Sequence, residues 1–105
     1  SAARTNAFSN PTFATAFARI ECHYFVNNCF FDKRTAILEN IDKIRNIPAM
    51  IIQGRYDACT PMRNAWDLHR AWPEAELTII TDAGHAATEA GITHELIRAT
   101  NKFST

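Results

Sequence analysis

Two ionisable residues, Asp57 and His85, are placed where they could act together. Asp57 lies in the segment GRYDACTP, three residues beyond Gly54, and His85 directly follows Gly84 in the segment TDAGHAATE. A carboxylate bonded to one imidazole nitrogen sets the tautomer of the ring and stabilises the cation that forms when the other nitrogen takes a nucleophile's proton. The pair therefore indicates two members of a hydrolase triad, with the aspartate before the histidine along the chain.

Each of the two residues also has a simpler interpretation. Asp57 would serve equally well as a turn aspartate that accepts hydrogen bonds from nearby amides, and His85 as an ordinary loop histidine. Their joint placement favours a shared role, because functional groups collect at the carboxyl ends of parallel strands.

The elements around this pair predict such strands. Residues 49–53 form a continuous apolar run between Pro48 and Gly54, which is typical of a strand covered on both faces, and residues 75–81 form a second strand candidate. Between them, residues 62–72 have the apolar spacing of a helix. A strand, a helix of this length and a second strand predict a parallel βαβ unit with a right-handed crossover.

Three further helices are predicted. The first covers residues 11–26, with Asn10 as its N-cap and Pro11 at its first position; the others cover residues 35–45 and 93–103. Two parallel strands alone would leave both edges unpaired, so the chain is expected to be part of a larger α/β fold. An open edge could also recruit a second copy, which makes a homo-oligomer possible.

Four segments carry a resemblance to a known family. They are ARIECHYFVN (18–27), GRYDACTPMRNAWDLHRAWPEAEL (54–77), AGH (83–85) and LIRATNKF (96–103). Together they resemble the C-terminal third of the proline iminopeptidases, also called prolyl aminopeptidases, which are α/β-hydrolases. The resemblance covers about residues 11–103 and implies two parts: residues 1–46 as the end of a helical cap with its connecting helix, and residues 47–105 as the C-terminal βαβα part of the catalytic domain.

The resemblance also implies an activity and a site. It matches Asp57 and His85 to the triad of a serine peptidase that releases N-terminal proline from peptides. It matches Glu21 to a cap glutamate that holds the amino group of that proline, although Cys22 stands where asparagine is expected. Tyr24, one turn from Glu21, would border the pyrrolidine ring. Without the resemblance, Glu21 would be taken for a surface helix residue.

No serine of this sequence is a suitable nucleophile for the triad. The serines, Ser1, Ser9 and Ser104, lie near the chain ends without flanking glycines. Cys59 is a less favoured nucleophile. Its thiolate would need His85 within hydrogen-bond reach, and the sequence alone does not show this. The chain alone is expected to be inactive and to need the missing N-terminal part of the same protein.

Composition narrows the possible partners. Lys and Arg together number 11 and Asp and Glu also number 11, so no basic excess favours nucleic acid or an anionic membrane. No apolar run has the length of a membrane span. No metal-ligand spacing such as H-E-x-x-H or C-x-x-C occurs, so neither metal nor cofactor is expected. The three cysteines suggest reduced thiols and a cytoplasmic protein.

Two other interpretations stay open. The chain could belong to a different α/β-hydrolase, such as an esterase or an epoxide hydrolase, that uses the same Asp57 and His85 under another cap. It could also be a non-catalytic interaction module that retains the βαβ unit.

Overall fold

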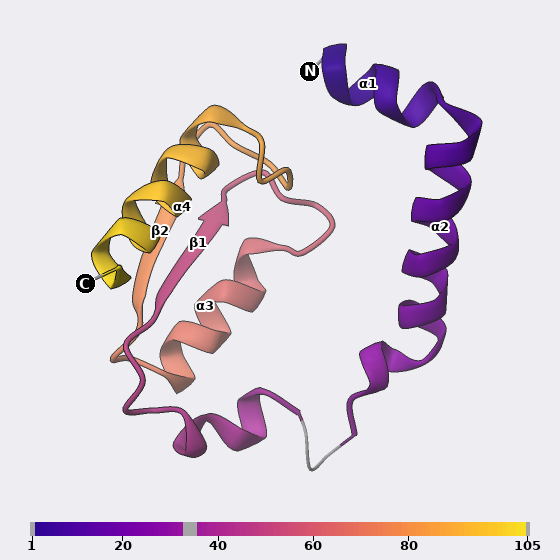
Figure 1. Ribbon diagram of the computed structural model, residues 1–105. Coiled ribbons are helices and arrows are strands. Elements are labelled where there is room, and N and C mark those ends of the chain that lie inside the picture. Colours follow the sequence, from indigo (N-terminus) through magenta and orange to yellow (C-terminus); the bar gives the residue numbers. More distant parts are fainter. Residues whose placement is uncertain (1, 33–35, 105) are drawn as a thin grey trace. The chain divides into compact units, whose positions relative to one another are not determined.

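The chain forms two compact units, which divide after Glu39. The computed structural model describes residues 2–32 and 36–104 (Figure 1). None of the helices in these two ranges combines the length and the apolar character that crossing a membrane requires.

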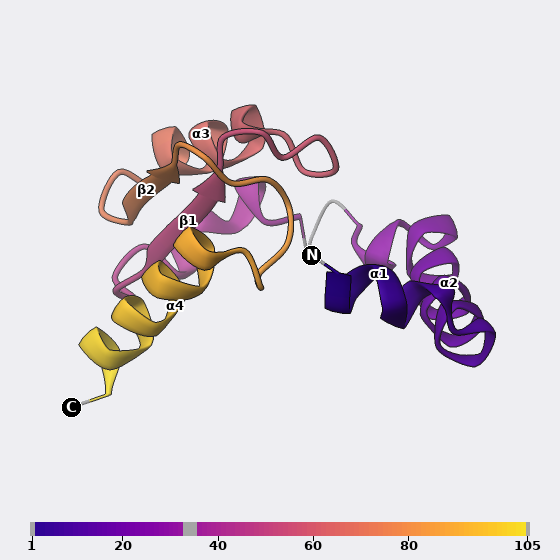
Figure 2. The same ribbon diagram turned by 90° about the horizontal axis from the view of Figure 1, so that it is seen from above.

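The second unit is a parallel βαβ unit followed by a helix. Its elements are β1 (Met50–Gly54), α3 (Met62–Ala71), β2 (Glu76–Ile80) and α4 (Ala90–Phe103). The strands pair in parallel, from Met50 opposite Glu76 to Gly54 opposite Ile80. Helices α3 and α4 cover opposite faces of this small sheet (Figure 2). The predicted α/β class and βαβ order are confirmed.

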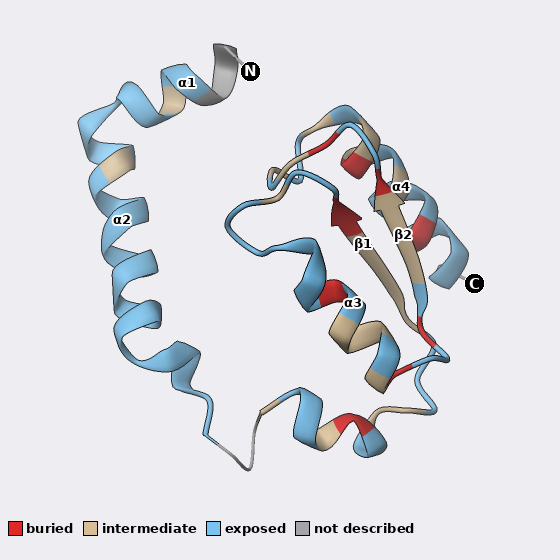
Figure 3. Ribbon diagram, turned by 180° about the vertical axis from the view of Figure 1, so that it is seen from behind, coloured by how far each residue is buried: buried red, intermediate tan, exposed pale blue. Residues whose placement is uncertain are grey.

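Apolar clusters bury both faces of the sheet. Ile51 packs with the cluster on the α3 side and Ile52 with the cluster on the α4 side, as expected for successive residues of a strand. The first cluster is built on Ile41, Trp72 and Ala75, and the second on Ile80, Ala83 and Ile92. Figure 3 shows buried positions on α3, on α4 and at the ends of both strands.

The predicted helix over residues 35–45 is wrong. The structure has the 3-10 helix η2 (Leu38–Lys43), interrupted at Asn40, while Thr35 lies outside the described residues. Ile41 is buried against Trp72, whose indole N–H donates to the carbonyl of Arg45 at 3.2 Å. Isoleucine and asparagine are only moderate helix formers, so these tertiary contacts decide the local geometry.

Helix α4 begins at Ala90, three residues earlier than predicted. Its first turn includes Gly91, where a Cβ atom would lie 2.6 Å from the Cγ2 atom of Ile80. Gly91 therefore allows the first turn of α4 to approach β2 closely.

The first unit consists of α1 (Ala2–Ser9), α2 (Pro11–Val26) and the 3-10 turn η1 (Asn28–Phe30). Helix α2 starts as predicted: the side-chain oxygen of Asn10 accepts from the backbone N–H groups of Thr12 and Phe13, at 3.0 and 3.2 Å. Helix α1 has no counterpart among the predicted elements. None of the residues of α2 is buried, and all are exposed except Ala14, which is half-buried (Figure 3).

Aromatic rings join the two helices of the first unit. The ring of Phe8 lies 5.4 Å from that of Phe13 and 5.1 Å from that of Phe17, both edge to face. These apolar side chains remain between 38% and 45% exposed. The apolar side chains of α2 therefore contact neighbouring rings but are not buried in a hydrophobic core.

A close approach of two backbones joins the strand ends of the second unit. A Cβ atom at Gly54 would overlap with the carbonyl oxygen of Gly84 and lie 2.8 Å from that of Ala83. The N–H of Tyr56 donates to the carbonyl of Ala83 at 2.9 Å, and that of Arg55 to the carbonyl of Ile80 at 3.0 Å. The loops after β1 and β2 are therefore held directly against each other.

This contact predicts that Gly54→Ala is destabilising. Because the clash is with backbone, which cannot rotate away, we expect a loss of about 2 to 3 kcal/mol in the free energy of unfolding, measured with urea. Gly84→Ala is the matched control, since the nearest atoms to its Cβ would lie at 3.5 Å and it should change stability by less than about 1 kcal/mol. Equal stability of the two variants would contradict the proposed constraint.

Candidate active site

Asp57 and His85 meet at the carboxyl ends of β1 and β2. The imidazole Nδ1 lies 3.0 Å from Oδ2 and 3.1 Å from Oδ1 of the carboxylate. The residues come from the loops that follow adjacent parallel strands, and the backbone contacts at Gly54 hold these loops together. The carboxylate and the imidazole can therefore share a proton across a separation of 28 residues in the sequence.

Asp57 is held by more than its histidine. Its Oδ1 accepts from the backbone N–H groups of Cys59 at 3.0 Å and Thr60 at 2.9 Å, and its Oδ2 accepts from the Thr60 hydroxyl at 2.7 Å. The two interpretations of Asp57 are both correct structurally, because it is a turn aspartate and also the partner of His85. Its side chain is 7% exposed, whereas that of His85 is 48% exposed.

These contacts keep Asp57 ionised. Burial by itself raises the pKa of Asp57, but the hydrogen bonds from the Thr60 backbone and hydroxyl, and then from His85, outweigh it. The pKa of Asp57 falls from its usual 3.8 to about 2. A fixed, charged acceptor of this kind holds the proton of the imidazole on Nδ1 and leaves Nε2 to exchange a proton with a reacting group.

Three supporting residues were not predicted from the sequence. One is Thr60, whose hydroxyl also lies 3.5 Å from the Nδ1 atom of His85. The second is Gln53, which is buried and donates from Nε2 to the carbonyls of Gly54 and Thr60, at 2.9 and 3.0 Å. The role of Gln53 could have been suspected because it is the one polar residue in the apolar run 49–53. A buried polar side chain needs hydrogen-bond partners inside the protein.

The third unpredicted residue, Glu89, holds the histidine loop. Its carboxylate accepts from the N–H of Gly84 at 3.0 and 3.1 Å and from the N–H of Ala86 at 2.9 Å. These amides flank His85, so Glu89 fixes the backbone on both sides of the imidazole. An acidic residue just before a helical run indicates the start of a helix. The sequence does not show that its side chain contacts the preceding loop.

The predicted substrate-binding residues lie in the other compact unit. Glu21 and Tyr24 are exposed on α2 and are one turn apart. The Tyr24 ring is 50% exposed and contacts the ring of Phe30 edge to face at 5.5 Å. The structure thus brings Asp57 and His85 together, whereas Glu21 and Tyr24 lie on α2 in the first unit.

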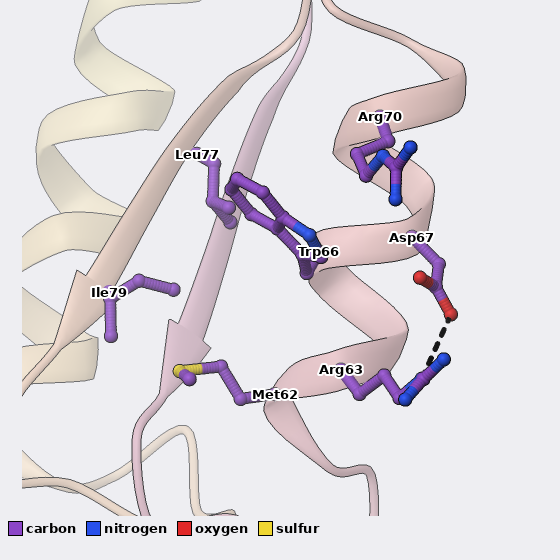
Figure 4. A pocket seen from close by; sticks show the side chains of 7 residues that line it. All are labelled: Met62, Arg63, Trp66, Asp67, Arg70, Leu77 and Ile79. Atoms are coloured by element: carbon purple, nitrogen blue, oxygen red, sulfur yellow. Dashed lines mark ion pairs between the residues drawn. The ribbon is translucent and has the colours of Figure 1, made fainter.

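A separate hollow lies on the α3 side of the sheet. Met62 and Trp66 of α3 and Leu77 and Ile79 of β2 line it, with a volume of about 600 Å³ (Figure 4). Among the described residues, those that hydrogen-bond to Asp57 or His85 are not part of its lining. Trp66 remains 52% exposed there, whereas Trp72, which directly follows α3, is buried.

One histidine and the cysteines lie apart from the catalytic pair or are exposed to solvent. The Nδ1 atom of His69 lies 2.9 Å from the carbonyl oxygen of Ala75, so this half-buried ring has a hydrogen-bond partner. The thiols of Cys22, Cys29 and Cys59 are free and exposed.

An aspartate and a histidine that share a hydrogen bond at the carboxyl ends of parallel strands are the arrangement of an α/β-hydrolase. A family model described as "TAP-like protein" matches residues 10–98, and the chain belongs to this α/β-hydrolase family. The predicted resemblance is confirmed by its relatives. The chain is 61% identical over 91 residues to the proline iminopeptidase of Arabidopsis thaliana, an alignment covering 87% of this chain and 24% of the relative.

Bacterial relatives agree with this finding. Identity is 54% over 96 residues to a probable proline iminopeptidase of Leptolyngbya boryana, covering 91% of this chain and 30% of the relative. It is 52% over 94 residues to the proline iminopeptidase of Xylella fastidiosa strain Temecula1, covering 90% and 30%. The chain therefore spans about a quarter to a third of the length of these relatives.

The hydrogen bonds to Asp57 predict a stability change in acid. The folded-state pKa lies below the unfolded one, so the stabilisation is present above about pH 4 and is lost as the pH falls to about 2. The difference in urea stability between the unmodified chain and Asp57→Asn should therefore shrink across this range. A carboxyl NMR titration of Asp57 with its midpoint at the usual 3.8 would contradict the assignment.

The contacts of Glu89 predict local loosening in Glu89→Gln. A neutral amide accepts more weakly than a carboxylate, so the N–H groups of Gly84 and Ala86 should exchange with solvent about 5- to 10-fold faster. The matched control is Glu95→Gln on α4, where Glu95 pairs with Arg98 at 2.7 Å and should leave both amides unchanged. Unchanged exchange in Glu89→Gln, measured by NMR, would show that Glu89 does not hold the loop.

Proposed function

We propose that this chain is the C-terminal part of a serine aminopeptidase that releases N-terminal proline from peptides. The observation that carries the proposal is the hydrogen bond between His85 Nδ1 and Asp57 at the ends of adjacent parallel strands. The names of the relatives support the choice of substrate, since each of the three described above is named a proline iminopeptidase or a probable one.

In this proposal His85 is the general base and then the general acid. Its Nε2 takes the hydroxyl proton of a serine from the upstream part of the protein as the serine oxygen attacks the prolyl carbonyl. The same proton then passes to the departing amine, and Asp57 stabilises the imidazolium in between. Water repeats the sequence to release proline and restore the serine. No serine of this chain has the glycine-flanked setting of a nucleophile elbow, so the chain alone is expected not to turn over.

We assign substrate recognition to Glu21 and Tyr24. A carboxylate can accept from the secondary ammonium of an N-terminal proline, and an aromatic ring can border its pyrrolidine. The exposure of Glu21 and the ring contact between Tyr24 and Phe30 are consistent with this use. The substrates would be peptides that begin with proline.

We assign residues 1–46 to the end of a helical cap with its connecting segment, and residues 47–105 to the catalytic domain. The break between the compact units, after Glu39, falls within the first of these parts. The partner of this chain is then the upstream part of the same protein, and a second copy is a further candidate for an open sheet edge. The exposed free thiols favour the cytoplasm.

A chimera tests this function. The matching segment of the Arabidopsis thaliana relative is replaced by this chain, and hydrolysis of L-proline β-naphthylamide is measured. We expect activity in the chimera, and a fall of at least about 10³-fold in kcat for His85→Ala and Asp57→Asn.

A further variant separates the peptidase from other hydrolases. Glu21→Gln should lower kcat/KM for the proline substrate roughly 10- to 100-fold, because a charge-assisted hydrogen bond is lost, and should leave p-nitrophenyl acetate hydrolysis unchanged. Glu39→Gln, also exposed, is the matched control. A folded chimera that hydrolyses only the ester would favour another hydrolase, and one that hydrolyses neither would favour the interaction module.

A further inference from the structure

The thiol of Cys59 completes a set of three metal-ligand types beside the catalytic pair. The carboxylate of Asp57, the thiol of Cys59 and the imidazole of His85 each present a ligand atom, and these atoms all lie within 4.8 Å of one another. We propose that this cluster binds Zn²⁺, and that the metal takes the place of the proton between Asp57 and His85. The consequence for catalysis rests on the proposed function, whereas metal binding itself does not.

The three donors suit zinc in type and number. Sites with three protein ligands and one open position are common for Zn²⁺, with bonds of about 2.3 Å to sulfur and about 2.0 to 2.2 Å to nitrogen and oxygen. A tetrahedral arrangement then places the ligand atoms roughly 3.3 to 3.7 Å apart. The present distance between Nδ1 and Oδ2 is 3.0 Å, so the pair needs to open by only a few tenths of an ångström. The thiol needs to approach by about 1 Å, which a rotation of the exposed Cys59 side chain can supply.

The existing hydrogen bonds would support a metal as well as a proton. Asp57 would keep its bonds from the backbone N–H groups of Cys59 and Thr60, and from the Thr60 hydroxyl. Such outer partners orient metal ligands and strengthen binding. Glu89 holds the loop of His85 from both sides. Two of the three ligands are therefore already fixed before a metal arrives.

Metal binding would switch off the general base. The neutral imidazole carries one proton, which sits on Nδ1 when the ring donates to Asp57. With Zn²⁺ on Nδ1, that proton must sit on Nε2, so Nε2 has no lone pair to accept the serine proton. The Cys59 thiol releases one proton to solvent, and Asp57 binds as the carboxylate that it already is. No electron transfer is needed.

Sequence spacing did not indicate this site. Asp57 and Cys59 are two residues apart in one loop, and the third ligand comes from the loop after the next strand. The cluster exists because the strand ends are in register. Linear motifs such as H-E-x-x-H and C-x-x-C do not describe a cluster of this kind.

Cobalt titration of the 105-residue chain under reducing conditions tests the proposal, with Co²⁺ as a spectroscopic substitute for Zn²⁺. We expect one equivalent of Co²⁺ to give a thiolate-to-metal band in the near ultraviolet and the visible bands of a tetrahedral site, both removed by added Zn²⁺. Cys59→Ser should abolish the thiolate band and weaken binding at least about 10-fold.

The controls are the two other exposed thiols. Cys22→Ser and Cys29→Ser should each leave the cobalt spectrum and the affinity unchanged. A thiolate band that persists in Cys59→Ser, or no band in the unmodified chain, would overturn the proposal. In ¹⁵N spectra Zn²⁺ should shift Nδ1 of His85 and place the proton on Nε2; a ring that keeps its proton on Nδ1 would also overturn it.

The chimera distinguishes this inference from the proposed function. An active chimera that is inhibited by Zn²⁺, and loses this inhibition in Cys59→Ser, supports both. An active chimera that Zn²⁺ inhibits equally in both forms removes only the metal site. An inactive chimera with the expected cobalt spectrum removes only the peptidase.

Discussion

The site depends on a contact between two backbones. The ends of β1 and β2 approach so closely that Gly54 has no room for a side-chain carbon beside the carbonyls of Gly84 and Ala83. The approach allows the hydrogen bonds from the N–H of Arg55 to the end of β2 and from the N–H of Tyr56 to the loop that carries the histidine. Because the strands pair in parallel with Gly54 opposite Ile80, the two loops leave the sheet on the same edge. The meeting of Asp57 and His85 follows from this packing.

A buried carboxylate at such a position needs partners, and the loop supplies them locally. Desolvation opposes the charged form of Asp57, yet its oxygens accept from three donors in its own loop and from His85. Gln53 donates to the Thr60 carbonyl of that loop, and Glu89 accepts from the amides of the neighbouring one. The charge is thus held in place before any substrate is present, so little reorganisation is left for the moment of proton transfer.

The same geometry admits two uses that exclude each other. A proton on Nδ1 of His85 leaves Nε2 free to act as a base, and a metal on Nδ1 forces the proton onto Nε2. Cys59 makes the second state accessible because its thiol lies beside the pair. Control of activity through the imidazole tautomer would require no movement of the sheet, only a change in what Asp57 and His85 share.

The predictions that held depend on local patterns. Asn10 marks the start of α2 because its side chain accepts from the N–H groups of the first turn, and Gly54 is the last residue of the first strand. The predictions that failed depend on distant contacts. Residues 35–45 have helical spacing, but the burial of Ile41 against Trp72 produced a 3-10 helix instead. The roles of Thr60, Gln53 and Glu89 were not predicted, because they depend on which groups these side chains contact in the folded chain.

The sequence by itself determined the βαβ order, the helix after Asn10, and the placement of an aspartate and a histidine at the ends of successive strands. These features rest on apolar periodicity and on proline, glycine and asparagine, whose effects extend over only a few residues. Only the tertiary structure decided that the imidazole, the carboxylate and the Cys59 thiol converge within 4.8 Å. Their convergence requires strand register and loop contact across 28 residues, and such distances arise from packing of the whole unit, which no local pattern specifies.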